Sequence, residues 1–177
     1  PSLIAAGHQS AEDATPLVAR GDLFWPTHPE SKSNLQYIFL EDMLVAPIYN
    51  STLNQSSRTV WIPPGSWQDA WNGSVVVGPA TLSTTQPYER LPLWHRADGG
   101  LLMAVEEPAT RVEDQDWSRI TLHARPALAG LKNTTRTLRE RGSAARTQIV
   151  MRTFGDGRVR FEIGAAGDGA ARGWFVR

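Results

Sequence analysis

Acidic side chains are the first candidates for chemistry in this sequence, because a carboxylate can act as acid, base or nucleophile. Asp42 follows Glu41 at the start of an apolar run, and other acids gather at Glu106-Glu107 and from Glu113 to Asp116. The sequence marks no two of them as a catalytic pair. We expect Asp42 to contact a substrate or, alternatively, to be an ordinary acid at a strand end. The later acids could bind a hard cation through oxygens, or form a solvated face.

Other catalytic and metal-binding residue types form no recognisable pattern. The chain has no Cys, which excludes a disulfide framework. No two His residues show the short spacing of zinc ligands, and no Gly-x-Ser-x-Gly motif is present. We therefore predict no metal, no cofactor and no catalytic residue within this chain.

Tryptophan is frequent, with seven residues in a chain of 177. An indole offers a flat apolar face and an N–H donor, so it can stack on a sugar or fill a core. Trp25 lies in a predicted loop before the most apolar window, and we expect it to contact a substrate or, alternatively, to pack in the core. Trp61, Trp67 and Trp71 lie among predicted strands, where packing is the favoured interpretation.

Four asparagines fit the pattern Asn-x-Ser/Thr: they are Asn50, Asn54, Asn72 and Asn133. This pattern accepts N-linked glycans on surface segments of secreted proteins. We interpret the chain as a glycoprotein of the secretory pathway or the extracellular space; the alternative is coincidence in Ser/Thr-rich turns.

The overall composition favours a β-rich globular domain. Twelve Pro and fifteen Gly indicate many turns, and no long helical period is evident. The formal net charge of +0 gives no reason to expect a nucleic acid as partner, and no apolar run approaches the ~20 residues of a membrane span. Because the first residue is Pro1, we expect a processed chain or one piece of a longer polypeptide.

The order of apolar and turn residues predicts the following elements. Residues 1–30 read as irregular, and Leu35, Ile38 and Phe39 fit one turn of helix. Residues 43–48 read as a buried strand of the kind found in parallel barrels. From Arg58 onward, short strands alternate with turns at a spacing typical of a sandwich. The predicted strands are 59–62, 67–70, 75–77, 80–84, 91–96, 101–105, 119–124, 135–140, 147–154, 158–163 and 173–176.

Three blocks of the sequence resemble, in the right order, the C-terminal portion of glycoside hydrolase family 31, the α-glucosidase and α-xylosidase group. Residues 16–26 are similar to the family's Val-Ala-Arg-Pro-Leu…Phe-Pro segment. Residues 36–48 are similar to Gln-Phe-Met-x-Gly-Asp-x-Leu-Leu-Val-Ala-Pro-Val, and residues 58–108 resemble the proximal C-terminal sandwich. The chain departs from the family pattern at Leu40, where Gly is usual, at Asn34, where Asp is common, and at Asp98, which interrupts Arg-Ala-Gly-Gly.

The resemblance implies an all-β fold: antiparallel β-sandwich domains that follow the last strand of a (β/α)8 barrel. Residues 1–50 would end the catalytic barrel, residues 51–112 would form the proximal sandwich, and residues 113–177 a short distal β-domain. The partner would be the upstream barrel of the same polypeptide, which carries the catalytic aspartates. The parent would be a retaining α-glucosidase that hydrolyses terminal α-linked glucose in an α-glucoside or oligosaccharide, without a metal.

Two other functions remain open at this point. The chain could be a non-catalytic carbohydrate-binding or structural glycoprotein that reuses these β-domains. Alternatively, the parent could keep the fold without the catalytic aspartates and act as an assembly partner.

Overall fold

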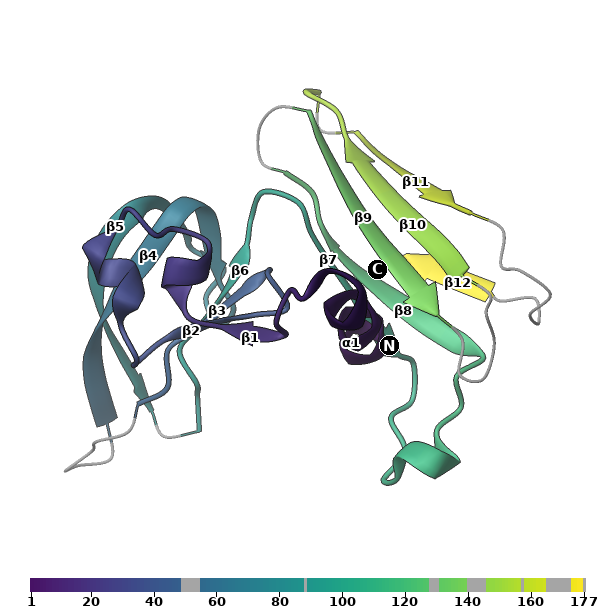
Figure 1. The fold of residues 1–177 in the computed structure, drawn as a ribbon, viewed down its shortest axis with the longest axis horizontal. Helices are drawn as coiled ribbons and strands as arrows, with labels where there is room; N and C mark the ends of the chain where they lie inside the picture. The colour runs from purple at the N-terminus through teal and green to yellow at the C-terminus, as the bar shows by residue number, and fades with distance from the viewer. Residues whose placement is uncertain are drawn as a thin grey trace. The chain divides into compact units, whose positions relative to one another are not determined.

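The computed structural model describes residues 1–48, 55–87, 89–127, 131–139, 146–156, 158–164 and 173–176. The chain divides into two compact units (Figure 1). We call residues 16–98 the curled-sheet unit, and residues 1–15 together with residues 99–177 the sandwich unit. Both consist mainly of antiparallel strands, which confirms the predicted all-β class. The assignment of residues 1–50 to the end of a barrel stays a prediction.

Among its described residues, the curled-sheet unit holds a sheet of six strands in the order β1-β2-β3-β6-β4-β5. All five neighbouring pairs are antiparallel. Two short 3-10 helices, η1 and η2, lie between β1 and β2 in the chain. The bounds are β1 Val18–Ala19, η1 Gly21–Leu23, η2 Pro29–Lys32, β2 Tyr37–Phe39, β3 Met43–Val45, β4 Gln55–Asp69, β5 Val75–Pro87 and β6 Leu93–Arg96.

This sheet curls around one apolar core. Ile38 of β2 and Ile62 of β4 belong to the same buried cluster, although their strands are not neighbours in the sheet. The side-chain amide of Gln36, just before β2, bonds to the backbone of β4. Its Nε2 donates to the Trp61 carbonyl oxygen (2.8 Å), and its Oε1 accepts from the Trp61 N–H (3.0 Å). Because Gln36 is only 8% exposed, these two bonds satisfy polar atoms that water could not reach.

The two longest strands, β4 and β5, form a curved hairpin in Figure 1. The sequence predicted a turn at residues 63–66 and a break at residues 78–79, and the structure shows continuous strands through both places instead. An irregularity between Ile62 and Gly65 lets β4 bend without ending, with Gly65 at a φ of 111°. Opposite it, a side chain at Gly78 would collide with the Pro63 carbonyl oxygen, so glycine permits the close approach.

Two predictions around β3 are wrong. Residues 37–39 form a strand and not a turn of helix: Ile38 is buried between half-buried neighbours, while Leu35 is 45% exposed. Residues 43–45 do form a fully buried strand, but both neighbours, β2 and β6, run antiparallel to it. Leu44 belongs to the core cluster of the curled-sheet unit, and Met43 and Val45, on the other face of the strand, are also buried.

The sandwich unit packs two three-stranded sheets face to face, as Figure 1 shows. Leu101 and Leu122 from one sheet and Ile149 and Met151 from the other share a single core. One sheet has the order β12-β8-β7, in which β12 pairs parallel with β8, and the other has the order β11-β10-β9. The bounds are β7 Gly100–Val105, η3 Val112–Asp114, β8 Arg119–Arg125, β9 Lys132–Arg139, β10 Arg146–Thr153, β11 Val159–Ile163 and β12 Gly173–Val176.

The helix α1 (Ser2–Asp13) also belongs to the sandwich unit, although the sequence was expected to be irregular there. Ala5 enters the core, and Ser2 Oγ bonds to the backbone of Met103. Glu12 forms ion pairs with Arg139 and, at 3.1 Å, with Arg146. The apolar pattern of this helix is weak because few of its residues face the core. No helix in the described ranges is long and apolar enough to cross a membrane.

Candidate functional site

Trp25 lies in a loop that is closed by its own backbone bonds, between η1 and η2. The Trp25 N–H donates to the Gly21 carbonyl (2.9 Å), and the His28 N–H donates to the Trp25 carbonyl (3.1 Å). Gly21 packs on the backbone of Ser31, where an added Cβ would lie 3.0 Å from the Ser31 oxygen. The loop therefore holds Trp25 in a defined position.

Arg20, just before this loop, forms an ion pair with Asp22. Arg20 donates from Nε to Asp22 Oδ1 (2.8 Å) and from Nη2 to Asp22 Oδ2 (2.6 Å). Its Nη1 also donates to Asn34 Oδ1 at 3.4 Å, on the far side of the loop. The hydrogen bonds from Arg20 lower the pKa of the Asp22 carboxyl, and the same bonds raise the pKa of Arg20.

Trp25 packs by its edge against two buried indoles of β4. The ring centroids of Trp25 and Trp61 are 6.1 Å apart at 79°, and those of Trp25 and Trp67 are 6.4 Å apart at 68°. Trp61 and Trp67 are 6% and 0% exposed, which confirms the packing interpretation for both. Such edge-to-face pairs contribute about 0.5–1.5 kcal/mol beyond their buried area. Trp25 itself is half-buried and belongs to this packing.

Arg96 lies beside these indoles. Its guanidinium is 5.3 Å from the Trp67 centroid and 5.9 Å from the Trp25 centroid, within the range of a cation–π interaction. Its Nη1 is 3.6 Å from Asp98 Oδ2. Its backbone N–H donates to the carbonyl of Asp42 at 2.8 Å. Arg96 thus contacts both residues that the sequence marked as substrate-contact candidates, Trp25 and Asp42.

Asp42 is 7% exposed and follows a turn with unusual backbone angles. Leu40 and Glu41 have φ values of 52° and 63°, in the left-handed region that favours glycine. This geometry explains why Gly suits the position of Leu40 in the family pattern. The turn brings the Asp42 carbonyl to Arg96, where β3 pairs with β6.

We call these residues the Arg96 cluster: Trp25, Asp42, Trp61, Trp67, Arg96 and Asp98. Their chemistry suits the binding and positioning of a ligand. The cluster offers an indole, a cation held by Asp98, and a carboxylate that is almost covered. Within the described residues, no three or more His, Cys, Asp or Glu side chains gather in a way that could hold a metal ion.

Sequence reasoning did not single out Arg96, although a signal was present. Successive side chains of a strand alternate between its faces, so residues two apart share a face. Trp94 is 2% exposed and lies two residues before Arg96 on β6. A cation on the same face as a buried indole needs a partner, and the neighbouring tryptophans provide it.

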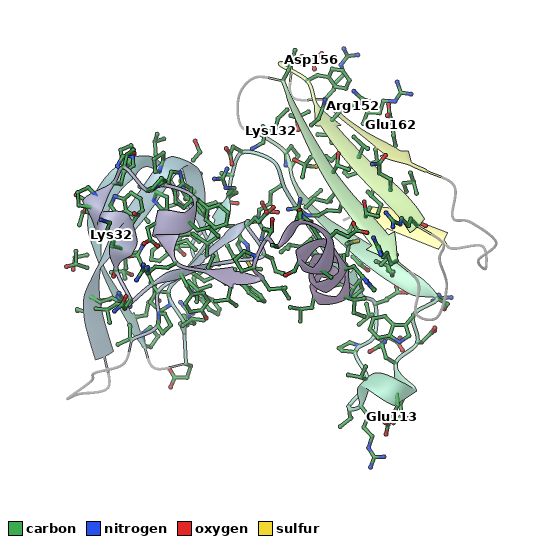
Figure 2. The ribbon with its side chains drawn as sticks, viewed as in Figure 1. Lys32, Glu113, Lys132, Arg152, Asp156 and Glu162 are labelled. Atoms are coloured by element: carbon green, nitrogen blue, oxygen red, sulfur yellow. The ribbon has the colours of Figure 1, made fainter. Side chains whose placement is uncertain are left out.

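The later acids line a cavity of about 450 Å³ in the sandwich unit. Its lining residues are Glu106, Glu107, Pro108, Ala109, Asp114, Asp116, Ser118 and Arg119. The Ser118 N–H donates to Asp116 Oδ1 (2.8 Å), and this bond lowers the pKa of Asp116. Figure 2 shows Glu113 at the end of the loop that carries η3, pointing away from the sheet.

The glycosylation candidates fall in different settings. Asn72 is exposed in the turn between β4 and β5, and Asn133 is exposed within β9. Asn50 and Asn54 lie outside the described residues. Trp71, which precedes Asn72, is 45% exposed and lies outside the core, in contrast to Trp61 and Trp67.

The structure defines the class of the protein as two compact, mainly antiparallel β-sheet units in one chain. Residues 14–99 match the glycosyl hydrolase family 31 C-terminal domain. Residues 14–99 therefore form a C-terminal domain of glycoside hydrolase family 31, as the resemblance of the motifs implied.

Three known proteins are similar to this chain in sequence or in fold. An isomaltosyltransferase from Sporosarcina globispora is 24% identical over 95 residues, which is 53% of this chain and 8% of the relative. A dextranase of the same family from Flavobacterium johnsoniae has the same fold over 93% of this chain and 21% of its own, with a TM-score of 0.77 and 17% identity. The cycloalternan-forming enzyme of Listeria monocytogenes matches over 85% of this chain and 14% of its own, with a TM-score of 0.69 and 22% identity. The chain therefore spans only a minor part of each relative's length.

Proposed function

We propose that this chain is the C-terminal part of a retaining α-glucosidase whose catalytic aspartates lie on an upstream barrel. The observation that carries the proposal is the family 31 match over residues 14–99. The relatives named above include a dextranase and an isomaltosyltransferase, whose names indicate action on dextran and transfer of isomaltosyl groups. An α-glucoside or oligosaccharide is accordingly the proposed substrate of the parent.

The proposed role of the chain itself is to close and buttress that barrel. Val18 (55% exposed) lies on β1, which is the first strand in the sheet order and has one edge without a strand neighbour among the described residues. Leu23 and Leu35, close to β1 and β2 in the chain, are 56% and 45% exposed. Exposed apolar side chains beside an open strand edge are typical of a surface that another element covers.

The test is an assay of the full-length gene product on maltose and isomaltose. NMR should show release of α-glucose first, because double displacement retains the anomeric configuration. Release of β-glucose first would contradict the retaining mechanism. Complete inactivity on α-linked glucosides would contradict the enzymatic proposal.

A non-catalytic carbohydrate-binding or structural glycoprotein is the second candidate, favoured by the exposed Trp71 beside the sequon at Asn72. The secretory pathway or extracellular space is the proposed location for either function. Sequencing the upstream strands for two catalytic aspartates separates the two candidates.

A further inference from the structure

Trp71 presents an open aromatic surface at the turn between β4 and β5. It is 45% exposed, while Trp61, Trp67 and Trp94 are each 6% exposed or less. Leaving a large apolar side chain in water forgoes the free energy of burying it, about 25 cal/mol for each Å². The exposed area of this indole is therefore available for a ligand to cover.

The orientation of this indole is set by hydrogen bonds. Trp71 Nε1 donates to the Leu91 carbonyl at 2.7 Å. Oδ1 of Asp69, which is 7% exposed, accepts from the backbone N–H groups of Trp71 (2.8 Å) and Asn72 (3.1 Å). Gly73, with a φ of 76°, completes the turn. A ring held in this way loses little conformational entropy when a ligand stacks on it.

Arg90 occupies one side of the ring. Its guanidinium carbon is 5.5 Å from the Trp71 centroid, which is cation–π geometry. Because a planar ring has two faces and Nε1 is already bonded, we assign the exposed area to the second face and the free edge. The indole ring of Trp71 can pack against the apolar face of a sugar ring, and the N–H groups of the Arg90 guanidinium can donate hydrogen bonds to sugar hydroxyls.

A cavity of about 240 Å³ lies beside Arg90 and Leu91, which line it and also contact the Trp71 ring. Its other lining residues are Pro47, Ile48, Pro87, Glu89 and Pro92. Glu89 and Arg90 carry opposite charges on this wall, so the site favours a neutral polar ligand over a polyanion.

We propose that Trp71 and Arg90 form a glucan-binding platform, at which one sugar of an α-linked glucose chain stacks on the open face of Trp71. The next sugar of the chain passes the edge of the ring, and its hydroxyls bond to Arg90 and Glu89. The platform would hold a polymeric substrate on the curled-sheet unit and would take no part in bond cleavage. The choice of glucose as the sugar rests on the proposed function. The geometry of the platform rests only on the structure.

Trp71→Ala in the full-length gene product tests the platform. Affinity electrophoresis in gels with soluble dextran or amylose measures glucan binding, with deoxynojirimycin added to block a glucosidase active site. Hydrolysis of p-nitrophenyl α-glucoside is measured in parallel. We expect Trp71→Ala to weaken glucan binding about tenfold, the equivalent of about 1.4 kcal/mol, with kcat/KM on the small substrate unchanged.

Two further variants keep the test decisive. Val77→Ala, at a residue 69% exposed on the neighbouring strand β5, should leave glucan binding unchanged. Trp71→Phe keeps a flat ring but loses the Nε1 bond to the Leu91 carbonyl that orients it, so it should bind glucan more weakly than Trp71 and more tightly than Trp71→Ala. The reference protein and all variants carry Ser74→Ala, which removes the Asn72 sequon and hence any glycan next to the ring.

The outcomes separate this inference from the proposed function. Unchanged glucan binding in Trp71→Ala overturns the platform, as does a wild-type protein that binds no glucan. An equal loss of glucan binding and small-substrate activity assigns Trp71 a structural role and also overturns it. Glucan binding that depends on Trp71 in a protein inactive on α-glucosides supports the platform and contradicts the α-glucosidase proposal.

Discussion

Arg96 and Trp25 are linked by a cation–π contact in which the guanidinium lies 5.9 Å from the indole centroid. The contact joins a loop residue to strand β6, 71 positions later in the chain. It holds the loop between η1 and η2 on the curled sheet, because Arg96 is also placed by Trp67, Asp98 and the Asp42 carbonyl.

Arg96→Ala should lower the free energy of unfolding by about 1–2 kcal/mol, since the contact is partly desolvated. The Arg96 side chain is 25% exposed. Urea denaturation followed by tryptophan fluorescence measures the change. The matched control is Arg158→Ala: its guanidinium lies 5.8 Å from the Phe154 centroid but is 80% exposed, and it should cost about 0.5 kcal/mol or less. Equal costs in the two variants would contradict the role given to Arg96.

Leu40→Gly should be more stable than Leu40→Ala by about 1 kcal/mol, because the backbone at this position has a φ of 52°. In an ordinary strand or helix the order is reversed, with Gly less stable than Ala by about 0.5–1 kcal/mol. Both variants lose the packing free energy of the Leu side chain, so this loss cancels when their stabilities are compared. Thermal denaturation measures the difference, and the ordinary order would show that the turn is not left-handed in solution.

Asp22 should make part of the stability depend on pH. Hydrogen bonds from Arg20 lower its pKa in the folded state, so its contribution is present above the unfolded value of about 3.9 and is lost as pH falls through the folded pKa. Asp22→Asn should therefore show a smaller loss of stability on acidification. NMR titration of the Asp22 carboxyl should find its pKa lowered in the wild type and closer to the ordinary value in Arg20→Gln. An ordinary value in both proteins would rule out the pair as the cause.

Val18→Lys should destabilise the full-length gene product if β1 faces the proposed barrel, because a charge would then be buried at the contact. Val112→Lys is the control, since Val112 is 71% exposed in η3 of the sandwich unit. A fall in Tm for Val18→Lys alone supports the buttressing role. Identical Tm values in wild type and both variants would argue that β1 is not covered.

Ser74→Ala should remove one N-linked glycan from protein secreted by a eukaryotic host. The change destroys the sequon but keeps the turn, because Asn72 Oδ1 accepts from the backbone N–H of Ser74 (2.8 Å) and not from its hydroxyl. A gel shift after glycosidase treatment measures the glycan. Ser83→Ala, on exposed β5 and outside any sequon, should show no change. The same mobility for Ser74→Ala and wild type would mean that Asn72 carries no glycan.

Local pattern was enough to find most strands of the sandwich unit. Val159 and Phe161 alternate with charged residues and do pack on the core, and the backbone of Phe154 and Arg158 closes the predicted turn at 2.9 Å. On the neighbouring strand, Figure 2 shows Arg152 close to Glu162, and the two side chains form an ion pair at 3.1 Å. The alternation fails at Ile163, which is 38% exposed at the strand end.

The sequence by itself determined the all-β class, the family and the burial of strand residues 43–45, because apolar alternation, turn residues and motif order are local properties of the chain. Only the tertiary structure decided that β3 lies between β2 and β6, that β4 continues past its prolines, and that Arg96 reaches Trp25. These features depend on strand order and on which side chains meet across a closed sheet. Such long-range pairings are selected by packing over the whole unit, and no short stretch of sequence specifies them.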